Sequence, residues 1–331
     1  MTRRFAVLGA GVMGLAVATE LAARGHDVLL ADPALGPGTQ GCSWWAGGML
    51  APFCEYENAE EPVLRHGQAA IGWWDAHAGG VTRNGTLVVA LGRDRAELDR
   101  FARRTEGFEV VGGNRLVELE PDLGTRFDRA LFFADEAHLD PRAAMAALQS
   151  GLSARGIAVA ADLSGDADGR EIIDCRGLAA RDILPDLRGV RGEMLVLRCP
   201  DVTLTRPVRL LHPRVPIYLV PRGDGVFMLG ATMIESDRRG VVTARSVLEL
   251  LSAAYALNPA FGEAEVLELG ADARPAFPDN LPRIGRAHGR LYANGLYRHG
   301  YLLAPAVAQQ LADHIETGDK PEFWHETDDQ R

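Results

Sequence analysis

The chain has 331 residues, of which 47% are apolar and 24% are charged. These shares are typical of globular proteins and exclude wholesale disorder, collagen and coiled coil, and the length suits one large or two modest domains. The 35 Lys and Arg residues against 45 Asp and Glu residues give a net charge of −10. Because such a charge repels phosphate backbones, we expect no nucleic-acid partner.

Glycine is in excess, with 37 residues in the chain, about 11% against an average of about 7%. The glycines follow no period, so they must serve turns or places where the backbone comes close to a ligand. The nine histidines form no HExxH motif and no other pair with ligand spacing, which predicts no metal site.

The cysteines and the first residues indicate a compartment. Cys42, Cys54, Cys175 and Cys199 are scattered without a CxxC pair, which favours free thiols in a reducing cytoplasm over a disulfide framework. The basic and apolar start of the chain imitates a signal peptide, but Glu20 interrupts the apolar run. We therefore expect neither a signal peptide nor a membrane span.

The first 32 residues follow the order of a dinucleotide-binding βαβ unit. An apolar run at residues 5–8 predicts a buried parallel strand, and residues 9–14 form a GxGxxG fingerprint. A helix is expected at residues 15–24, followed by a second strand at residues 28–31. A fingerprint in this context predicts a dinucleotide site, whereas the motif alone would be a weak signal.

Each residue of the fingerprint has a mechanical role. Gly9 permits the tight turn, Gly11 lets the backbone approach a pyrophosphate, and Gly14 allows the helix to pack closely on the strand. The N-terminus of the helix offers N–H groups and a positive dipole end to phosphates. Asp32 ends the second strand, where an acid binds a ribose hydroxyl and disfavours NADP relative to NAD or FAD.

Two further segments narrow the choice of cofactor. Residues 41–52 read GCSWWAGGMLAP and residues 294–305 read NGLYRHGYLLAP. With the fingerprint and the motifs RGEM, YLVPR, GATM and ARP between them, these segments resemble the D-amino-acid-oxidase-like FAD oxidoreductases. The resemblance extends over about residues 5–312 and is greatest to the glycine oxidases of thiamine biosynthesis.

The resemblance implies non-covalent FAD that lies extended across the fold. The fingerprint and Asp32 would hold the ADP half, and the segments around residues 42–49 and 296–302 would surround the pyrophosphate and the flavin. No contact to the adenine is identified in the polar segment 161–174. The implied cofactor-binding residues are Gly9, Gly11, Val12, Met13, Gly14, Asp32, Cys42, Ser43, Gly47, Gly48, Met49, Gly177, Leu296, Tyr297, Arg298, His299, Gly300, Tyr301 and Leu302.

The candidate substrate site contains two arginines, because an arginine fork matches a carboxylate with two parallel hydrogen bonds. Without the motifs, Arg298 and Arg274 would be interpreted as surface ion pairs, and Tyr218 and Met233 as core residues. The resemblance instead implies that Arg298 first, and Arg274 next, bind the substrate carboxylate. It also implies that Tyr218 directs its hydroxyl toward the substrate and that Met233 lines the pocket, which suits a substrate with little or no side chain.

Three positions depart from the common family pattern. Trp44 and Trp45 replace small residues, and Pro216 stands where some members carry a polar ring. The two tryptophans could narrow the pocket or pack between domains, and the sequence assigns neither of them a role.

The activity that the resemblance implies is FAD-dependent oxidative deamination of glycine. A hydride passes from Cα to flavin N5, the imine gives glyoxylate and ammonia, and oxygen becomes hydrogen peroxide. The implied partners are a small amino acid and molecular oxygen, with a homo-oligomer and transfer of the imine to thiazole synthase as further implications. Two alternatives stay open: a flavin oxidase or dehydrogenase for sarcosine, proline or a D-amino acid, and a flavin-binding subunit without catalysis.

The placement of the motifs predicts an α/β fold with an α+β substrate part. A Rossmann-like FAD-binding domain at residues 1–82, 135–190 and 271–331 is interleaved with an antiparallel-sheet substrate-binding domain at residues 83–134 and 191–270. Within the second domain we expect strands at residues 86–90, 194–197 and 226–230 and an amphipathic helix at residues 244–257.

Overall fold

The strand β1 (Arg4–Leu8) lies inside a seven-stranded sheet in the computed structural model, which describes residues 2–124, 126–163 and 169–326. It pairs in parallel with β2 on one side and β9 on the other. The sheet has the order β18 (Trp324–His325), β16 (Arg283–Ala287), β17 (Arg290–Asn294), β9 (Glu171–Asp174), β1, β2 (Asp27–Ala31) and β8 (Val159–Ala160). The predicted βαβ unit is therefore confirmed.

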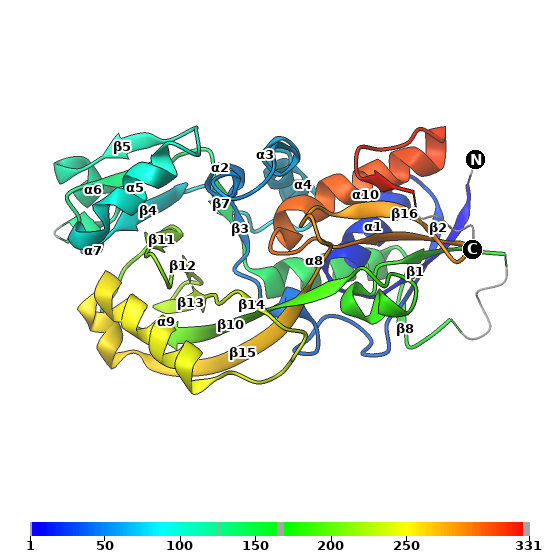
Figure 1. Ribbon diagram of the computed structural model, residues 1–331. Helices are drawn as coiled ribbons and strands as arrows, with labels where there is room; N and C mark the ends of the chain where they lie inside the picture. Colours follow the sequence, from blue (N-terminus) through cyan, green and yellow to red (C-terminus); the bar gives the residue numbers. More distant parts are fainter. Residues whose placement is uncertain (1, 125, 164–168, 327–331) are drawn as a thin grey trace.

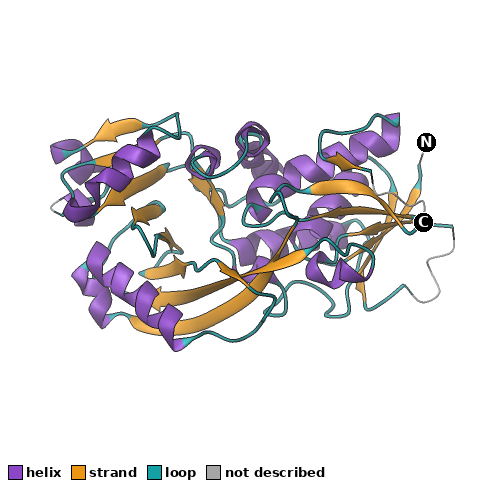
Figure 2. Ribbon diagram, in the orientation of Figure 1, coloured by secondary structure: helices purple, strands orange, loops and turns teal. Residues whose placement is uncertain are grey.

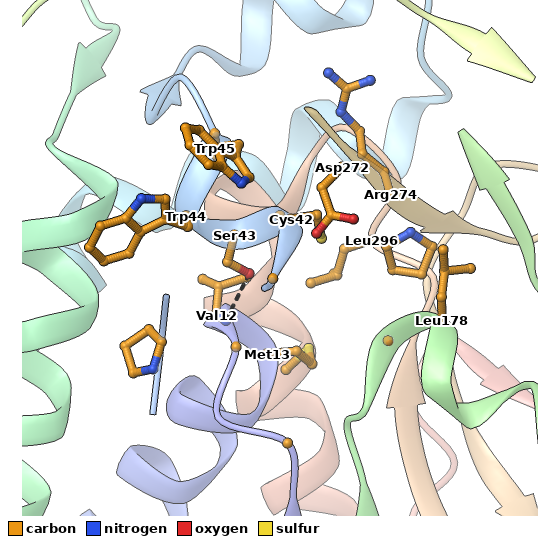
Figure 3. A pocket seen from close by; sticks show the side chains of 18 of the residues that line it. Val12, Met13, Cys42, Ser43, Trp44, Trp45, Leu178, Asp272, Arg274 and Leu296 are labelled. Atoms are coloured by element: carbon orange, nitrogen blue, oxygen red, sulfur yellow. Dashed lines mark hydrogen bonds between the residues drawn. The ribbon is translucent and has the colours of Figure 1, made fainter. Parts of the chain in front are cut away.

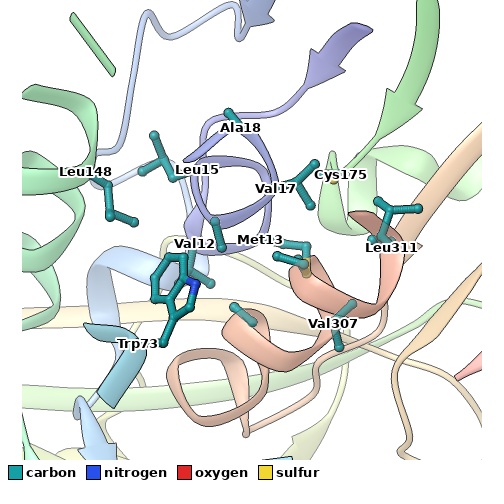
Figure 4. Close-up of a cluster of buried hydrophobic side chains, with 14 of the residues drawn as sticks. Val12, Met13, Leu15, Val17, Ala18, Trp73, Leu148, Cys175, Val307 and Leu311 are labelled. Atoms are coloured by element: carbon teal, nitrogen blue, oxygen red, sulfur yellow. The ribbon is translucent and has the colours of Figure 1, made fainter. Parts of the chain in front are cut away.

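Three helices pack together beside this sheet: α1 (Val12–Ala23), α8 (Pro141–Ala154) and α10 (Gly300–Thr317) (Figure 2). Helix α1 lies between the other two, and Figure 4 shows its side chains meeting Leu148 of α8 and Val307 of α10. Ten of its twelve residues are buried, and apart from Thr19 and Glu20 the helix is apolar on all sides. This burial explains why the start of the chain has the composition of a signal peptide.

A second sheet of nine strands forms the other half of the molecule (Figure 1). All its pairs are antiparallel except the parallel pair of β11 with β4. Its order is β14 (Ile234–Glu235), β10 (Arg188–Arg198), β13 (Val226–Gly230), β12 (Ile217–Pro221), β11 (Val208–Leu211), β4 (Thr86–Ala90), β6 (Ala130–Phe133) and β5 (Glu109–Val111), with β15 (Glu265–Ala276) also paired to β10.

Helix α9 (Ala244–Leu257) packs on β10, β12 and β13 of the second sheet. It begins after Thr243, whose hydroxyl accepts a hydrogen bond from the backbone N–H of Ser246, an arrangement typical of an N-cap. The apolar residues Leu250, Ala254 and Leu257 face the sheet and are buried. The expected strands and the expected amphipathic helix of this half are all present.

Shorter elements complete the described chain. A two-stranded sheet pairs β3 (Met49–Leu50) with β7 (Ala137–His138). The remaining helices are α2 (Pro52–Tyr56), α3 (Glu61–Gly67), α4 (Ala70–His77), α5 (Arg95–Ala102), α6 (Gly113–Leu119) and α7 (Pro121–Gly124). The 3-10 segments are η1 (Cys42–Trp45), η2 (Gly92–Asp94), η3 (Gly177–Asp182) and η4 (Pro259–Glu263).

The two sheets draw on interleaved parts of the chain, as the α/β prediction requires. The strands of the second sheet fall within residues 83–134 and 191–270, except that β10 starts at Arg188 and β15 continues to Ala276. The domain boundaries themselves stay a prediction. Residue 1, residues 327–331, and residues 164–168 of the segment without an adenine contact lie outside the described residues.

No described helix combines the length and the apolar character that crossing a membrane would need.

Candidate active site

A cavity of about 770 Å³ is lined by residues of both sheets and of the loops that join them. Every cofactor and substrate residue expected from the sequence lines it except Gly14. Segments that are far apart in the sequence, around residues 10, 43, 177, 218, 274 and 298, thus meet at one place.

The turn after β1 is built so that only glycine fits at two positions. Gly9 has φ of +94°, and a Cβ added there would lie 2.7 Å from the carbonyl oxygen of Cys175. A Cβ on Gly14 would lie 1.7 Å from the carbonyl oxygen of Gly9. Gly14 therefore serves the close packing of α1 on the turn, which is the role predicted for it, although it does not line the cavity.

The first turn of α1 faces the cavity with its backbone N–H groups. Gly11 is the N-cap and offers no side chain, and the N–H of Val12 donates to Ser43 Oγ at 3.1 Å (Figure 3). At the end of β2, Asp32 Oδ2 accepts from the N–H of Ala10 and Oδ1 from the N–H of Ala34, each at 2.8 Å. The carboxylate of Asp32 is held at the position where an acid would meet a ribose hydroxyl.

The segment from Gly47 to Met49 is sandwiched between two other parts of the chain. A Cβ on Gly47 would lie 2.7 Å from the ring of Tyr218, and one on Gly48, where φ is +73°, would lie 2.2 Å from the carbonyl oxygen of Leu139. Arg222 Nη2 donates to the Gly47 carbonyl at 2.7 Å. Both glycines are thus required for the backbone to pass through this gap.

Arg298 enters the cavity from the residues before α10 and is bound to Glu55 of α2. Its Nε lies 2.6 Å from Glu55 Oε2, its Nη1 lies 3.7 Å from the sulfur of Met233, and its Nη2 is buried without a hydrogen-bond partner in the described chain. Burial works to raise the pKa of the Glu55 carboxyl, but Arg298 and Arg209 outweigh it and hold that pKa well below its ordinary value. Glu55 is therefore a carboxylate at working pH.

His299 lies behind this pair. Its Nε2 is 3.0 Å from Glu55 Oε2, and its Nδ1 is buried without a partner among the described residues. Burial lowers the pKa of the imidazole below its ordinary value, against the attraction of Glu55. The ring is therefore neutral at pH 7, so the positive charge here belongs to the arginines.

Arg274 reaches the cavity from β15 and has no carboxylate partner in the part of the chain that the structure describes. Its Nη1 donates to the carbonyl of Thr232 at 3.3 Å. The guanidinium lies against Gly192, where a Cβ would come 2.1 Å from Nη2. A cation without a counterion in a partly enclosed site favours an anionic ligand there.

Tyr218 and Met233 occupy different depths of the cavity. The Tyr218 ring packs on Gly230, its hydroxyl makes no hydrogen bond within the described residues, and burial raises its pKa above the ordinary value. Met233 is 52% exposed, and its sulfur accepts from the Tyr297 hydroxyl at 3.6 Å. Met233 therefore lines the pocket at its rim.

The tryptophans that the sequence left without a role both line the cavity and pack between elements. The guanidinium of Arg142 lies 4.5 Å from the ring of Trp44 and 5.4 Å from that of Trp45, and it forms two 2.8 Å hydrogen bonds with Glu268 of β15. These contacts fix η1 between α8 and the second sheet. The two tryptophans therefore pack between elements, which is one of the two roles that the sequence allowed for them.

Several charged lining residues were missed by the sequence reasoning, among them Arg209, Arg239 and Asp272. Arg209 of β11 donates to Glu55 Oε1 at 3.2 Å, and Arg239 forms an ion pair with Asp272, which lies beside Cys42 (Figure 3). Burial, with the charge of Asp272, raises the pKa of the Cys42 thiol to about 11. An inward-facing arginine in the apolar strand VRLL was the signal that could have revealed Arg209.

Glu55 was missed as well, since it stands in the acidic stretch CEYENAEE, which is typical of a solvated face. All four cysteines are free. Among the described residues no three His, Cys, Asp or Glu side chains come together as metal ligands.

Comparison with known proteins places these features in context. The family model described as FAD dependent oxidoreductase matches residues 4–314. A Rhizobium etli protein named as thiamine biosynthesis oxidoreductase ThiO is 56% identical over 95% of this chain and 97% of its own. Glycine oxidase of Pseudomonas aeruginosa is 28% identical over 97% of this chain and 96% of its own. The crystal structure of glycine oxidase from Geobacillus kaustophilus has a TM-score of 0.79 at 24% identity, covering 98% and 97% of the two chains.

Proposed function

Because the chain belongs to the family of FAD-dependent oxidoreductases, we propose that it catalyses the oxidative deamination of glycine. The observation that carries the proposal is the charge of the cavity. Within the described part of the chain, Arg274 has no carboxylate partner and the buried Nη2 of Arg298 has no acceptor. Both point to a ligand with a carboxylate. The name of the Pseudomonas aeruginosa relative, glycine oxidase, supports glycine as the substrate.

The residues of the cavity fit FAD. The gap at Gly9, Gly47 and Gly48 leaves no room for side chains, and the first turn of α1 directs N–H groups to where a pyrophosphate would bind. Asp32 is positioned for a ribose hydroxyl. The residues that would hold FAD are those expected from the sequence: Gly9, Gly11, Val12, Met13, Asp32, Cys42, Ser43, Gly47, Gly48, Met49, Gly177, Leu296, Tyr297, Arg298, His299, Gly300, Tyr301 and Leu302.

When bound, FAD supplies the redox chemistry, accepting a hydride from the substrate Cα and passing two electrons to oxygen to give hydrogen peroxide. Arg274 and Arg298 bind the substrate carboxylate and thereby fix the direction of its Cα–H bond. Tyr218, a neutral phenol because burial raises its pKa, offers its free hydroxyl to the same carboxylate. The amino acid must present a neutral amine, and no residue of the chain is required as a general base in this scheme.

The biological setting is supported by the ThiO name of the Rhizobium etli relative. It favours a place in thiamine biosynthesis, with the product imine either hydrolysed to glyoxylate and ammonia or transferred to thiazole synthase. That transfer, the assembly into a homo-oligomer and the cytoplasmic location stay predictions.

The experiment that tests the proposal is an anaerobic titration of the purified yellow protein with glycine, sarcosine, proline and D-alanine, followed by the bleaching of the flavin. Glycine should bleach it at the lowest concentration, and peroxide should then form when air is admitted. Bleaching by one of the other amino acids alone would favour the rival oxidase or dehydrogenase. Absence of bleaching by all four would favour a subunit that binds flavin without catalysis.

A further inference from the structure

Glu55 lies between Arg298 and Arg209, which belong to different parts of the molecule. Arg209 is in β11 directly opposite Tyr218 of β12, so the two side chains are neighbours on one face of the second sheet. Arg298 precedes α10. Glu55 on α2 therefore connects the second sheet with the residues that enter α10.

The two oxygens of Glu55 are divided between the two arginines. Oε1 accepts from Arg209 Nη1 at 3.2 Å, while Oε2 lies 2.6 Å from Arg298 Nε. The same Nη1 of Arg209 also donates to the carbonyl of Cys54 at 3.0 Å, and its guanidinium lies 5.5 Å from the ring of Phe101. Arg209 is thus fixed at three points, and it fixes the orientation of the Glu55 carboxylate in turn.

This orientation decides which edge of Arg298 is available. Glu55 engages Arg298 at Nε, and Nη2 remains buried without a partner in the described chain. Without Arg209, Oε2 would stay beside Arg298 Nε and His299 Nε2, but Oε1 would lose its partner. The carboxylate could then turn Oε1 onto Nη2 of Arg298 and complete the usual fork-on-fork pair. Arg298 would then be neutralised and would have no donor edge for a substrate carboxylate.

We infer that Arg209 is a positioning residue for the substrate site: by holding one oxygen of Glu55 it keeps the Nη edge of Arg298 open for the carboxylate of the substrate. Arg209 acts through Glu55 and needs no contact with the substrate. The inference rests on the proposed function only in taking the ligand to be a carboxylate.

The chain offers a matched control. Arg206 stands three residues before Arg209, its side chain is equally buried at 12% exposure, and it also pairs with a carboxylate, that of Glu120 at 2.9 Å. It does not line the cavity. Arg206→Met therefore reports the cost of removing a buried, paired arginine from this sheet, and Arg209→Met reports that cost together with any effect on the site.

The experiment uses the FAD-loaded protein and acetate as the probe, because acetate carries a carboxylate without an amine to be oxidised. Acetate binding is followed by the change in flavin absorbance. We expect Arg209→Met to weaken acetate binding and to raise KM for glycine at least 10-fold relative to Arg206→Met, with kcat changed less than 3-fold. Arg209→Lys, which keeps one donor for Glu55, should recover part of the loss, and it also serves if Arg209→Met does not fold.

A second variant tests the route of the effect. In Glu55→Gln the added Arg209→Met change should cost less than 3-fold more, because the two changes break the same connection. Equal acetate affinity in Arg209→Met and Arg206→Met would overturn the inference, and so would a wild-type flavin that does not respond to acetate. If acetate binds but glycine does not bleach the flavin, the proposed function fails. The acetate affinities of Arg209→Met and Arg206→Met still test the role of Arg209 in that case.

Discussion

The indole of Trp45 lies directly on the backbone of Gly270. A Cβ added to that glycine would lie 2.1 Å from Cε3 of the ring, and the ring also joins the small apolar cluster of Met194, Val196 and Met228. Trp45 of η1 thus occupies the space that a side chain at Gly270 of β15 would take. This pairing holds the segment beside the cavity against the second sheet.

Gly270→Ala should therefore destabilise the protein by about 1–3 kcal/mol, since the new methyl group meets the Trp45 ring, which also packs against Met194 and Met228. The effect is measured as a change in the free energy of unfolding. In a Trp45→Ala background the same change should cost nearly nothing, because the ring is gone. An equal penalty in both backgrounds would show that the strain comes from another contact.

Removal of Arg274 should weaken substrate binding more than removal of Arg239, a cavity arginine whose charge is already paired. We expect Arg274→Met to raise KM for glycine about 100-fold, which corresponds to about 2.8 kcal/mol at 1.4 kcal/mol per tenfold change. Steady-state kinetics with peroxide detection measure it. Arg239→Met is the comparison, and its effect should stay under about 10-fold because the charge of Arg239 is already paired with Asp272. Equal effects would refute the special position of Arg274.

Gly14→Ala should abolish tight FAD binding although Gly14 does not line the cavity. The added Cβ would sit 1.7 Å from the Gly9 carbonyl oxygen, so α1 must move away from the turn that receives the pyrophosphate. The FAD content of the purified protein reports this directly. Gly151→Ala in α8 has open space around it and should keep full FAD while gaining up to about 1 kcal/mol of stability.

Glu136 should make the stability of the protein depend on pH. Burial raises the pKa of its carboxyl to about 7 from an ordinary value of 4.5, even though the N–H of Cys54 partly opposes the shift. The folded state then binds the proton more tightly than the unfolded state, so this residue lowers stability as pH rises from about 4.5 to about 7, by about 3 kcal/mol in all.

Glu136→Gln removes that loss and keeps an acceptor for the Cys54 N–H. Its melting temperature relative to wild type should therefore be higher at pH 8 than at pH 5. Glu120→Gln is the control, because Glu120 is also buried but is paired with Arg206, and its change should destabilise at both pH values. A Glu136→Gln difference that does not vary with pH would contradict the raised pKa.

The sequence by itself determined the features that depend on neighbours along the chain. The βαβ unit at the N-terminus, three strands of the second sheet (residues 86–90, 194–197 and 226–230) and helix α9 follow from local periodicity and from glycines at fixed spacings. The resemblance of its ordered motifs added the cofactor and the set of residues around the cavity, and all of these except Gly14 line it.

Only the tertiary structure decided how the charges of the site are shared. Glu55, Arg209 and Arg298 stand more than eighty residues apart along the chain, and whether a buried cation is paired depends on which acid the fold brings within about 4 Å. No local pattern records that distance. For the same reason the role of Trp45 became visible only against Gly270, because packing space is a property of the assembled elements and not of either segment.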